Sequence, residues 1–96
     1  MTLNPFLQLG QGDSVELAFD SATHRARLAF GTNGFTGTLA DKGSFILIRA
    51  PRGVEALGYA ERLLKLKDPR ICEMWSPAGA IFHGPGAWWF FGFSAV

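Results

Sequence analysis

Hydrophobic residues alternate with polar or small residues along the first third of the chain. In residues 14–20 the hydrophobic side chains take every second position, and the same period returns in residues 24–30. A period of two predicts a strand with one buried face, and turn-forming residues at 20–23 separate the two segments. We therefore expect two strands, with the inward positions Val15, Leu17 and Phe19 in the first and Ala26, Leu28 and Phe30 in the second.

The Asn33-Gly34 pair after the second predicted strand indicates a tight turn. Asn-Gly favours the two-residue type I′ turn, because both central residues need positive φ angles. Such a turn pairs Phe30 with Gly37, and the pairs that follow fall on the face that the alternation already makes inward. Turn chemistry and hydrophobic period thus predict the same hairpin, which adds a third strand up to about Leu39.

The pattern changes from strand to helix in the middle of the chain. Residues 44–50 are apolar on both faces, which predicts a fourth strand that is central in the sheet or covered on both sides. From 54 to 67 the period becomes that of an amphipathic helix. Asp68-Pro69 ends this helix, because a residue before proline disfavours the α region. The helix face toward the core comprises Ala56, Leu57, Ala60, Leu63 and Leu64.

Three more strands are predicted after the helix, at about 70–75, 80–83 and 87–94, with turns at 76–79 and 84–86. The fold class is then α+β, with an antiparallel sheet in the order ββββ-α-βββ and the one helix, 54–67, packed on one face of a curled sheet. A length of 96 residues predicts a single domain over 1–96, of which 1–12 is a partly irregular N-terminal segment.

The C-terminal strand concentrates aromatic residues. As a strand it sends Trp88 and Phe90 to one face and Trp89, Phe91 and Phe93 to the other. A single helix covers only one face, so either the sheet curls around these rings or some of them remain exposed for a partner. Small β-rich domains often bury such rings in the core of a curled sheet, so a purely structural role for all five remains open. The predicted function follows from the second arrangement, because Trp and Phe are residues that anchor protein interfaces.

The function predicted from this strand is that of a small non-catalytic protein-binding module, such as an inhibitor, adaptor or accessory factor of the kind that phages and mobile elements encode. Its first candidate partner is a second copy of itself, as a homodimer. The predicted interface consists of Trp88, Trp89, Phe91, Phe93, Arg25 and Arg27.

Two other functions remain open. Aromatic stacking beside Arg25 and Arg27 suits single-stranded nucleic acid, although a net charge of +1 provides no basic track for phosphates. Alternatively, a pocket between the helix and the sheet binds a small ligand with Trp75, Phe82 and His83.

Composition narrows the class of protein further. The single cysteine, Cys72, allows no internal disulfide and suits a reducing compartment, so we expect a cytoplasmic protein. The apolar run at 87–93 is far shorter than the ~18–20 residues that span a bilayer, and the N-terminus does not resemble a signal peptide, so no membrane partner is expected. Cys72, His24 and His83 have no zinc-ligand spacing, and no carboxylate pair indicates acid–base catalysis. We therefore expect no enzyme activity, no metal and no cofactor.

Overall fold

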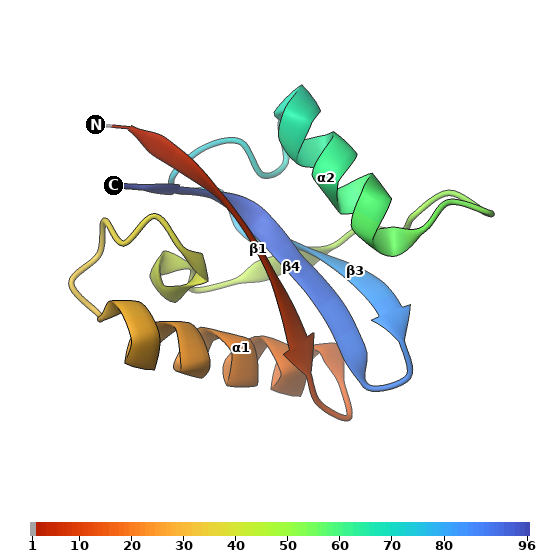
Figure 1. The fold of residues 1–96 in the computed structure, drawn as a ribbon, viewed down its shortest axis with the longest axis horizontal. Coiled ribbons are helices and arrows are strands. Elements are labelled where there is room, and N and C mark those ends of the chain that lie inside the picture. The colour runs from red at the N-terminus through yellow and green to blue at the C-terminus, as the bar shows by residue number, and fades with distance from the viewer. Residues whose placement is uncertain (1) are drawn as a thin grey trace.

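The computed structural model describes residues 2–96 as a four-stranded sheet between two helices (Figure 1). The strand order is β1-β4-β3-β2; β1 and β3 pair antiparallel to β4, whereas β2 pairs parallel to β3. In chain order the elements are β1 (Leu3–Gln11), α1 (Val15–Phe30), the short 3-10 helix η1 (Leu39–Asp41), β2 (Phe45–Leu47), α2 (Ala56–Leu66), β3 (Ala78–Gly84) and β4 (Ala87–Ala95).

The α+β class predicted from the sequence is confirmed, but the details of the sheet are not. The sheet is mixed and not purely antiparallel, and the element order differs from ββββ-α-βββ. The segment expected to be partly irregular, 1–12, contains the nine-residue strand β1. Two features account for these differences. The chain forms β1 and then α1 in the region where strands were predicted after residue 12, and β2 is followed by α2 before the parallel strand β3.

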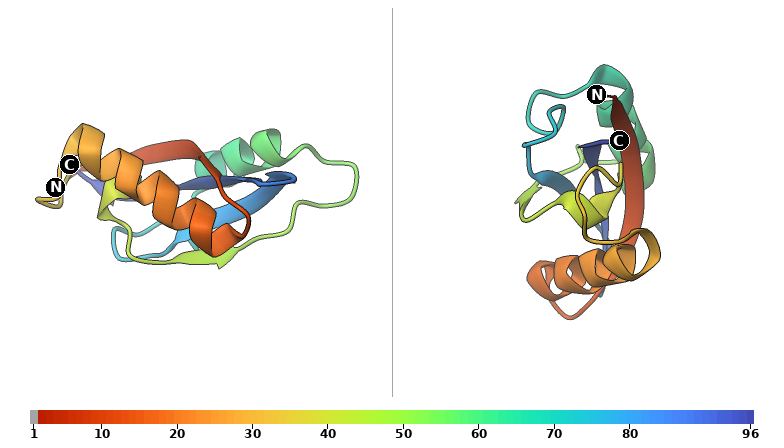
Figure 2. Two further views of the ribbon diagram at one scale, coloured as in Figure 1. Left: turned by 90° about the horizontal axis from the view of Figure 1, so that it is seen from below. Right: turned by 90° about the vertical axis from the view of Figure 1, so that its left-hand side faces the viewer.

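The two helices lie on opposite faces of the sheet, as Figures 1 and 2 show. One face, here called the α1 face, packs Phe6, Ala78, Ala80 and Phe90 against α1. The other, the α2 face, packs Ile81, Phe91 and Phe93 against α2. Side chains alternate along a strand, so β4 supplies a large ring to each layer. The prediction of one helix on one face is therefore wrong, because a second helix covers the other face.

Helix α1 occupies residues for which two strands were predicted. Its buried side chains follow a helical period, and they are Ala18, Phe19, Ala22, Thr23 and Ala26. The Ser14 hydroxyl caps the helix by accepting a hydrogen bond of 3.2 Å from the Leu17 amide. Leu17 and Leu28, which created the alternating pattern, are 55% and 75% exposed. The strand interpretation failed because it counted these exposed leucines as core.

The predicted Asn33-Gly34 hairpin is also absent. Positive φ angles occur one residue later than expected, at Gly34 (73°) and Phe35 (56°), and no strand flanks them. The following residues are held by side chains: the Asp41 carboxylate accepts hydrogen bonds from the Thr36 amide (2.8 Å) and hydroxyl (2.9 Å). Phe30 is the last residue of α1, so it does not belong to a strand that could pair with Gly37.

The strand predicted at 70–75 is a series of turns instead. Its carbonyl groups bond to a buried cation and not to a sheet. The Lys42 ammonium donates to the carbonyl oxygens of Glu73 (3.4 Å), Met74 (3.1 Å) and Ser76 (2.8 Å). Burial lowers the pKa of Lys42, and the neighbouring Asp41 carboxylate acts in the opposite direction.

Several elements match their predictions closely. Helix α2 spans Ala56–Leu66 where 54–67 was expected. Phe45–Leu47 is the strand β2 inside the predicted segment 44–50, but the prediction that this strand is central or covered on both faces is wrong: β2 is an edge strand, and Ile46 and Leu47 are exposed. Strands β3 and β4 form the predicted hairpin, with Gly86 at a positive φ of 74° in the turn. These are the parts of the chain where turn chemistry and hydrophobic period agree with the final packing.

Candidate functional site

The aromatic residues of β4 lie mostly in the core. Phe91 is 0% and Phe93 7% exposed, and both face α2. Trp88 and Trp89 are half-buried. The Trp88 ring packs edge-on against Phe82 at a centroid distance of 5.8 Å. Of the four β4 residues predicted to form an interface, the structure therefore leaves only the two tryptophans within reach of a partner.

The two predicted arginines lie on α1, away from most of these rings. Arg25 is exposed. The Arg27 guanidinium donates to the carbonyl oxygens of Ala40 (3.3 Å) and Lys42 (3.4 Å), which ties α1 to η1 and the residue after it. Because Trp89 faces the α2 side of the sheet, the structure does not bring it together with the arginines.

The residues of the predicted ligand pocket are divided between the two ends of β3. Phe82 and His83 lie near the hairpin end, and the His83 Nδ1 atom accepts a hydrogen bond of 3.1 Å from the Trp89 Nε1 atom. Trp75, 78% exposed, lies in the turns before the other end of β3. Phe82 does line a shallow cavity of about 660 Å³, together with Leu47, Ile48, Arg49, Ala50, Ile81 and Trp88.

The residues weighed for catalysis and metal binding are dispersed. Cys72 lies 3.9 Å from the Glu73 carboxylate but packs on the α2 face, whereas His24 is exposed on α1. Within residues 2–96, no three His, Cys, Asp or Glu side chains gather closely enough to hold a metal ion.

The feature that the sequence did not reveal is the outer edge of β1. Strand β1 ends the sheet, so among the described residues only β4 pairs with it. At its two ends the Thr2 carbonyl accepts from the Val96 amide (2.9 Å) and the Gly12 amide donates to the Gly86 carbonyl (3.1 Å). The register between them is continuous. Even-numbered residues therefore bond to β4, and odd-numbered residues direct their backbone groups away from the sheet.

Pro5 occupies one of these outward positions. Proline has no backbone N–H group. At this outward position an N–H group would point away from β4, so the proline removes no hydrogen bond between β1 and β4. The amides that remain on the outer edge are those of Leu3, Leu7, Leu9 and Gln11.

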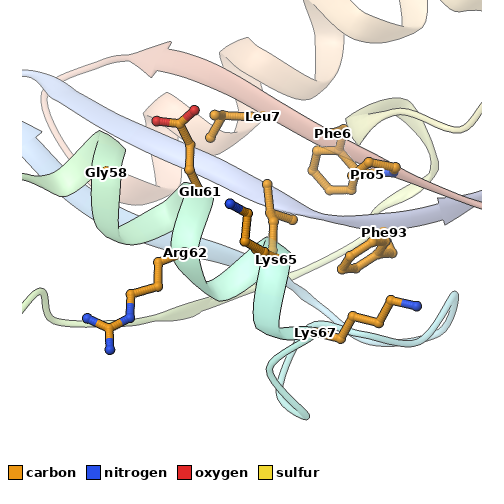
Figure 3. Close-up of a pocket in the computed structure, with 10 residues that line it drawn as sticks. Pro5, Phe6, Leu7, Gly58, Glu61, Arg62, Lys65, Lys67 and Phe93 are labelled. Carbon is orange, nitrogen blue, oxygen red and sulfur yellow. The ribbon is translucent and has the colours of Figure 1, made fainter.

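A groove runs beside β1, between this strand and α2 (Figure 3). Its volume is about 860 Å³. Figure 3 shows Glu61 and Lys65 pointing from α2 into the groove, while Arg62 points away from the sheet. The lining residues are Pro5, Phe6, Leu7, Gly58, Glu61, Arg62, Leu64, Lys65, Lys67 and Phe93.

The groove exists because α2 covers only part of its sheet face. The helix is short, and its fully buried positions, Ala60 and Leu63, pack on the cluster that contains Ile81, Phe91 and Phe93. Gly58 offers no side chain to fill the space toward β1. The apolar side chains of β1 on this face thus remain partly uncovered: Leu3 and Pro5 are exposed, and Leu7 and Leu9 are half-buried.

The rim of the groove is positively charged. It carries the three cations Arg62, Lys65 and Lys67 and the single anion Glu61. None of these three cations forms an ion pair with another residue of the described chain. The groove therefore combines an apolar floor with a surplus of exposed positive charge.

Comparison of the chain with protein-family models, with curated proteins and with solved structures finds no match. Neither helix in the described part of the chain has the length and apolar character needed to cross a membrane.

Proposed function

We propose that this protein is a non-catalytic protein-binding module that takes an extended segment of a partner as a fifth strand beside β1. The observation that carries the proposal is the outer edge of β1, where four amides and the intervening carbonyl groups face away from the sheet. An unpaired edge of this kind is a template for another strand, and strand addition is a recurrent mode of peptide recognition.

The composition of β1 supports a binding role for this edge. Proteins commonly protect long edges with charged residues, bulges or very short strands. Strand β1 has nine residues, no charged side chain and no break in register. Its outer edge is interrupted only around Pro5, which lacks an amide N–H and whose carbonyl accepts a hydrogen bond of 3.2 Å from the Asn4 side chain. The opposite edge is the three-residue strand β2, which is protected by its shortness. The β1 edge is therefore better suited than the β2 edge to pair with a strand of another chain.

The proposed interface lies at the edge of β1 and not on the aromatic residues of β4, where the sequence predicted it. Phe93 contributes to the floor of the groove beside β1 without reaching the solvent itself. The β4 rings then serve binding indirectly, because they hold β1 flat and in register on the sheet.

A library of random decapeptides displayed on phage provides the test, with Leu9 as the position to vary. Leu9→Pro removes an outward amide but no bond to β4, and Leu9→Ala, the matched control, removes the side chain and keeps the amide. Enriched peptides should bind the wild type and Leu9→Ala alike and bind Leu9→Pro at least about tenfold more weakly, measured by fluorescence anisotropy.

A second measurement protects the test against misfolding of Leu9→Pro. Peptide binding to the wild type should slow the hydrogen exchange of the Leu7 and Leu9 amides, whereas the even-numbered amides of β1 are already protected by β4. The proposal fails if Leu9→Pro binds peptide as tightly as Leu9→Ala, if the newly protected amides lie elsewhere, or if no peptide is enriched and the protein forms no dimer that Leu9→Pro dissociates.

A further inference from the structure

We infer that the segment received by β1 belongs to a different protein and carries apolar residues toward the groove and acidic residues at the groove's Lys65–Lys67 end. This inference rests on the proposed function, since it requires a strand beside β1. It adds the chemistry of the partner, which strand addition alone does not specify.

The position of the groove determines which partner side chains enter it. A fifth strand would lie about 4.8 Å beyond β1, with alternate side chains directed to the α2 face. That face is where the groove lies between β1 and α2. Every second partner side chain would therefore point into the groove. Burying an apolar side chain over Pro5, Leu7 and Phe93 is favourable, whereas a polar one there would lose its water without gaining a partner.

Charge along the rim is uneven and gives the partner a direction. Figure 3 places Glu61 beside Leu7, at one end of the groove, and Lys67 near Phe93, at the other. Lys65 points into the space between these ends. An acidic partner residue is thus attracted to the Phe93 end and repelled at the Leu7 end.

A second copy of this chain fits the groove poorly. Strand β1 contains no acidic residue that could face Lys65 or Lys67. Antiparallel pairing of two β1 strands around a two-fold axis also places both α2 helices on the same face, with their cationic rims turned toward each other. Like charges in that arrangement disfavour the homodimer expected from the sequence, and they favour a partner that brings its own carboxylates.

The inference is tested by repeating the decapeptide selection on two charge-reversal variants. Lys65→Glu reverses a charge in the groove; Arg25→Glu makes the same change in net charge on the exposed surface of α1, outside the groove. The wild type and Arg25→Glu should enrich peptides rich in Asp and Glu among apolar residues, and Lys65→Glu should shift the enrichment toward Lys and Arg. Urea unfolding of each variant checks that the fold is kept.

The affinities of the selected peptides supply the quantitative result. A peptide selected on the wild type should lose about tenfold in affinity on Lys65→Glu and about twofold or less on Arg25→Glu, and raising the salt concentration should narrow this difference. Equal losses on both variants, or enriched peptides without acidic residues, overturn the inference while strand addition still stands, provided that Leu9→Pro abolishes binding.

Two further outcomes would contradict the inference or the proposed function. A dimer on size-exclusion chromatography that Leu9→Pro dissociates, with no enriched peptide, makes a second copy the occupant and overturns the inference. Peptides that bind Leu9→Pro unchanged overturn the proposed function itself. The failures of the two proposals are thus distinguished by which variant loses binding.

Discussion

The two faces of β4 are packed in different ways, although one strand supplies both. On the α1 face a 16-residue helix covers the sheet, and the rings of Phe19, Phe45 and Phe90 meet at centroid distances of 5.0 to 6.1 Å. On the α2 face an 11-residue helix leaves the groove beside β1 open. Around Phe90 the α1 face is thus tightly packed, whereas the α2 face leaves apolar surface uncovered beside β1, which is the surface that the proposed partner strand would use.

Small residues explain how closely α1 approaches. Three of its buried residues are alanines, Ala18, Ala22 and Ala26, so the helix axis can lie near the strands. The contact is so close that a Cβ atom on Gly10 would lie 2.8 Å from the Ala18 carbonyl oxygen. Helix α2 has no comparable row of alanines facing β1, so it does not approach β1 as closely. The space between α2 and β1 therefore remains open as a groove.

The largest expected effect comes from removing a ring on the closed face. Phe90→Ala should lower the free energy of unfolding by about 3–5 kcal/mol, because Phe90 is fully buried and its surroundings cannot collapse. Phe93→Ala should cost less, since the groove beside it admits water and allows relaxation. Urea unfolding of both variants measures the difference. Equal losses would contradict the view that the two faces differ in closure.

A smaller loss of unfolding free energy is expected when the hydrogen bonds of Lys42 are removed. Lys42 follows η1 on the α1 face and donates to three carbonyl groups in the turns before β3. Lys42→Met should lower the free energy of unfolding by about 1–3 kcal/mol, because it leaves these carbonyl oxygens without a donor. Urea unfolding of the wild type and the variant measures this loss.

The pH dependence of the same variant has a defined sign. Burial places the pKa of Lys42 below its ordinary value, so in the alkaline range the unfolded chain binds more protons than the folded one. The wild type should therefore gain unfolding free energy relative to Lys42→Met as the pH rises toward the ordinary lysine pKa. A gap between the two unfolding curves that narrows with pH would contradict this assignment.

The smallest effect in this series is expected at Gly79, one of two glycines that face opposite helices, and a loss no larger than that of Lys42→Met is expected at the other, Gly10. Gly10→Ala places a methyl group against the Phe90 ring (2.5 Å) and against the α1 backbone, which cannot move aside. In Gly79→Ala the three atoms nearest to the new methyl group all belong to the Phe91 ring, the nearest also at 2.5 Å, on the sheet face that carries the open groove. We expect a loss of about 1–3 kcal/mol for Gly10→Ala and a smaller one for Gly79→Ala, measured by thermal unfolding. The reverse order would place the tighter packing on the α2 side.

The sequence predicted α2 and the β3–β4 hairpin well because local signals suffice there. The helical period of 56–66 and the Gly-Pro-Gly turn at 84–86 need no knowledge of distant contacts. In α1 two local patterns overlap: Leu17 and Phe19 alternate as in a strand, whereas the residues that are buried recur with the period of a helix, and Leu17 is exposed. Tertiary packing decided for the helix, since the sheet required a cover made of alanines.

The candidate site could not be predicted from the sequence for a different reason. An open edge is a property of strand order, and no local pattern states that β1 pairs with β4 on one side only. The segment 1–12 was expected to be partly irregular, whereas it holds an edge strand in which Pro5 takes an outward position that proline tolerates. The expected exposure of Phe91 and Phe93 depended on a single covering helix, and the second helix removed it.

The pairing of β1 with β4 has a consequence for how the chain folds. Leu3 lies opposite Ala95, so the longest strand pair of the sheet joins segments from the two ends of the described chain. Contacts this distant in sequence carry a large loop-closure entropy and slow the search for the native state. Until β4 has docked, the uncharged β1 segment is available to any other strand, and during that interval recognition of a partner and misassembly would compete for the same backbone.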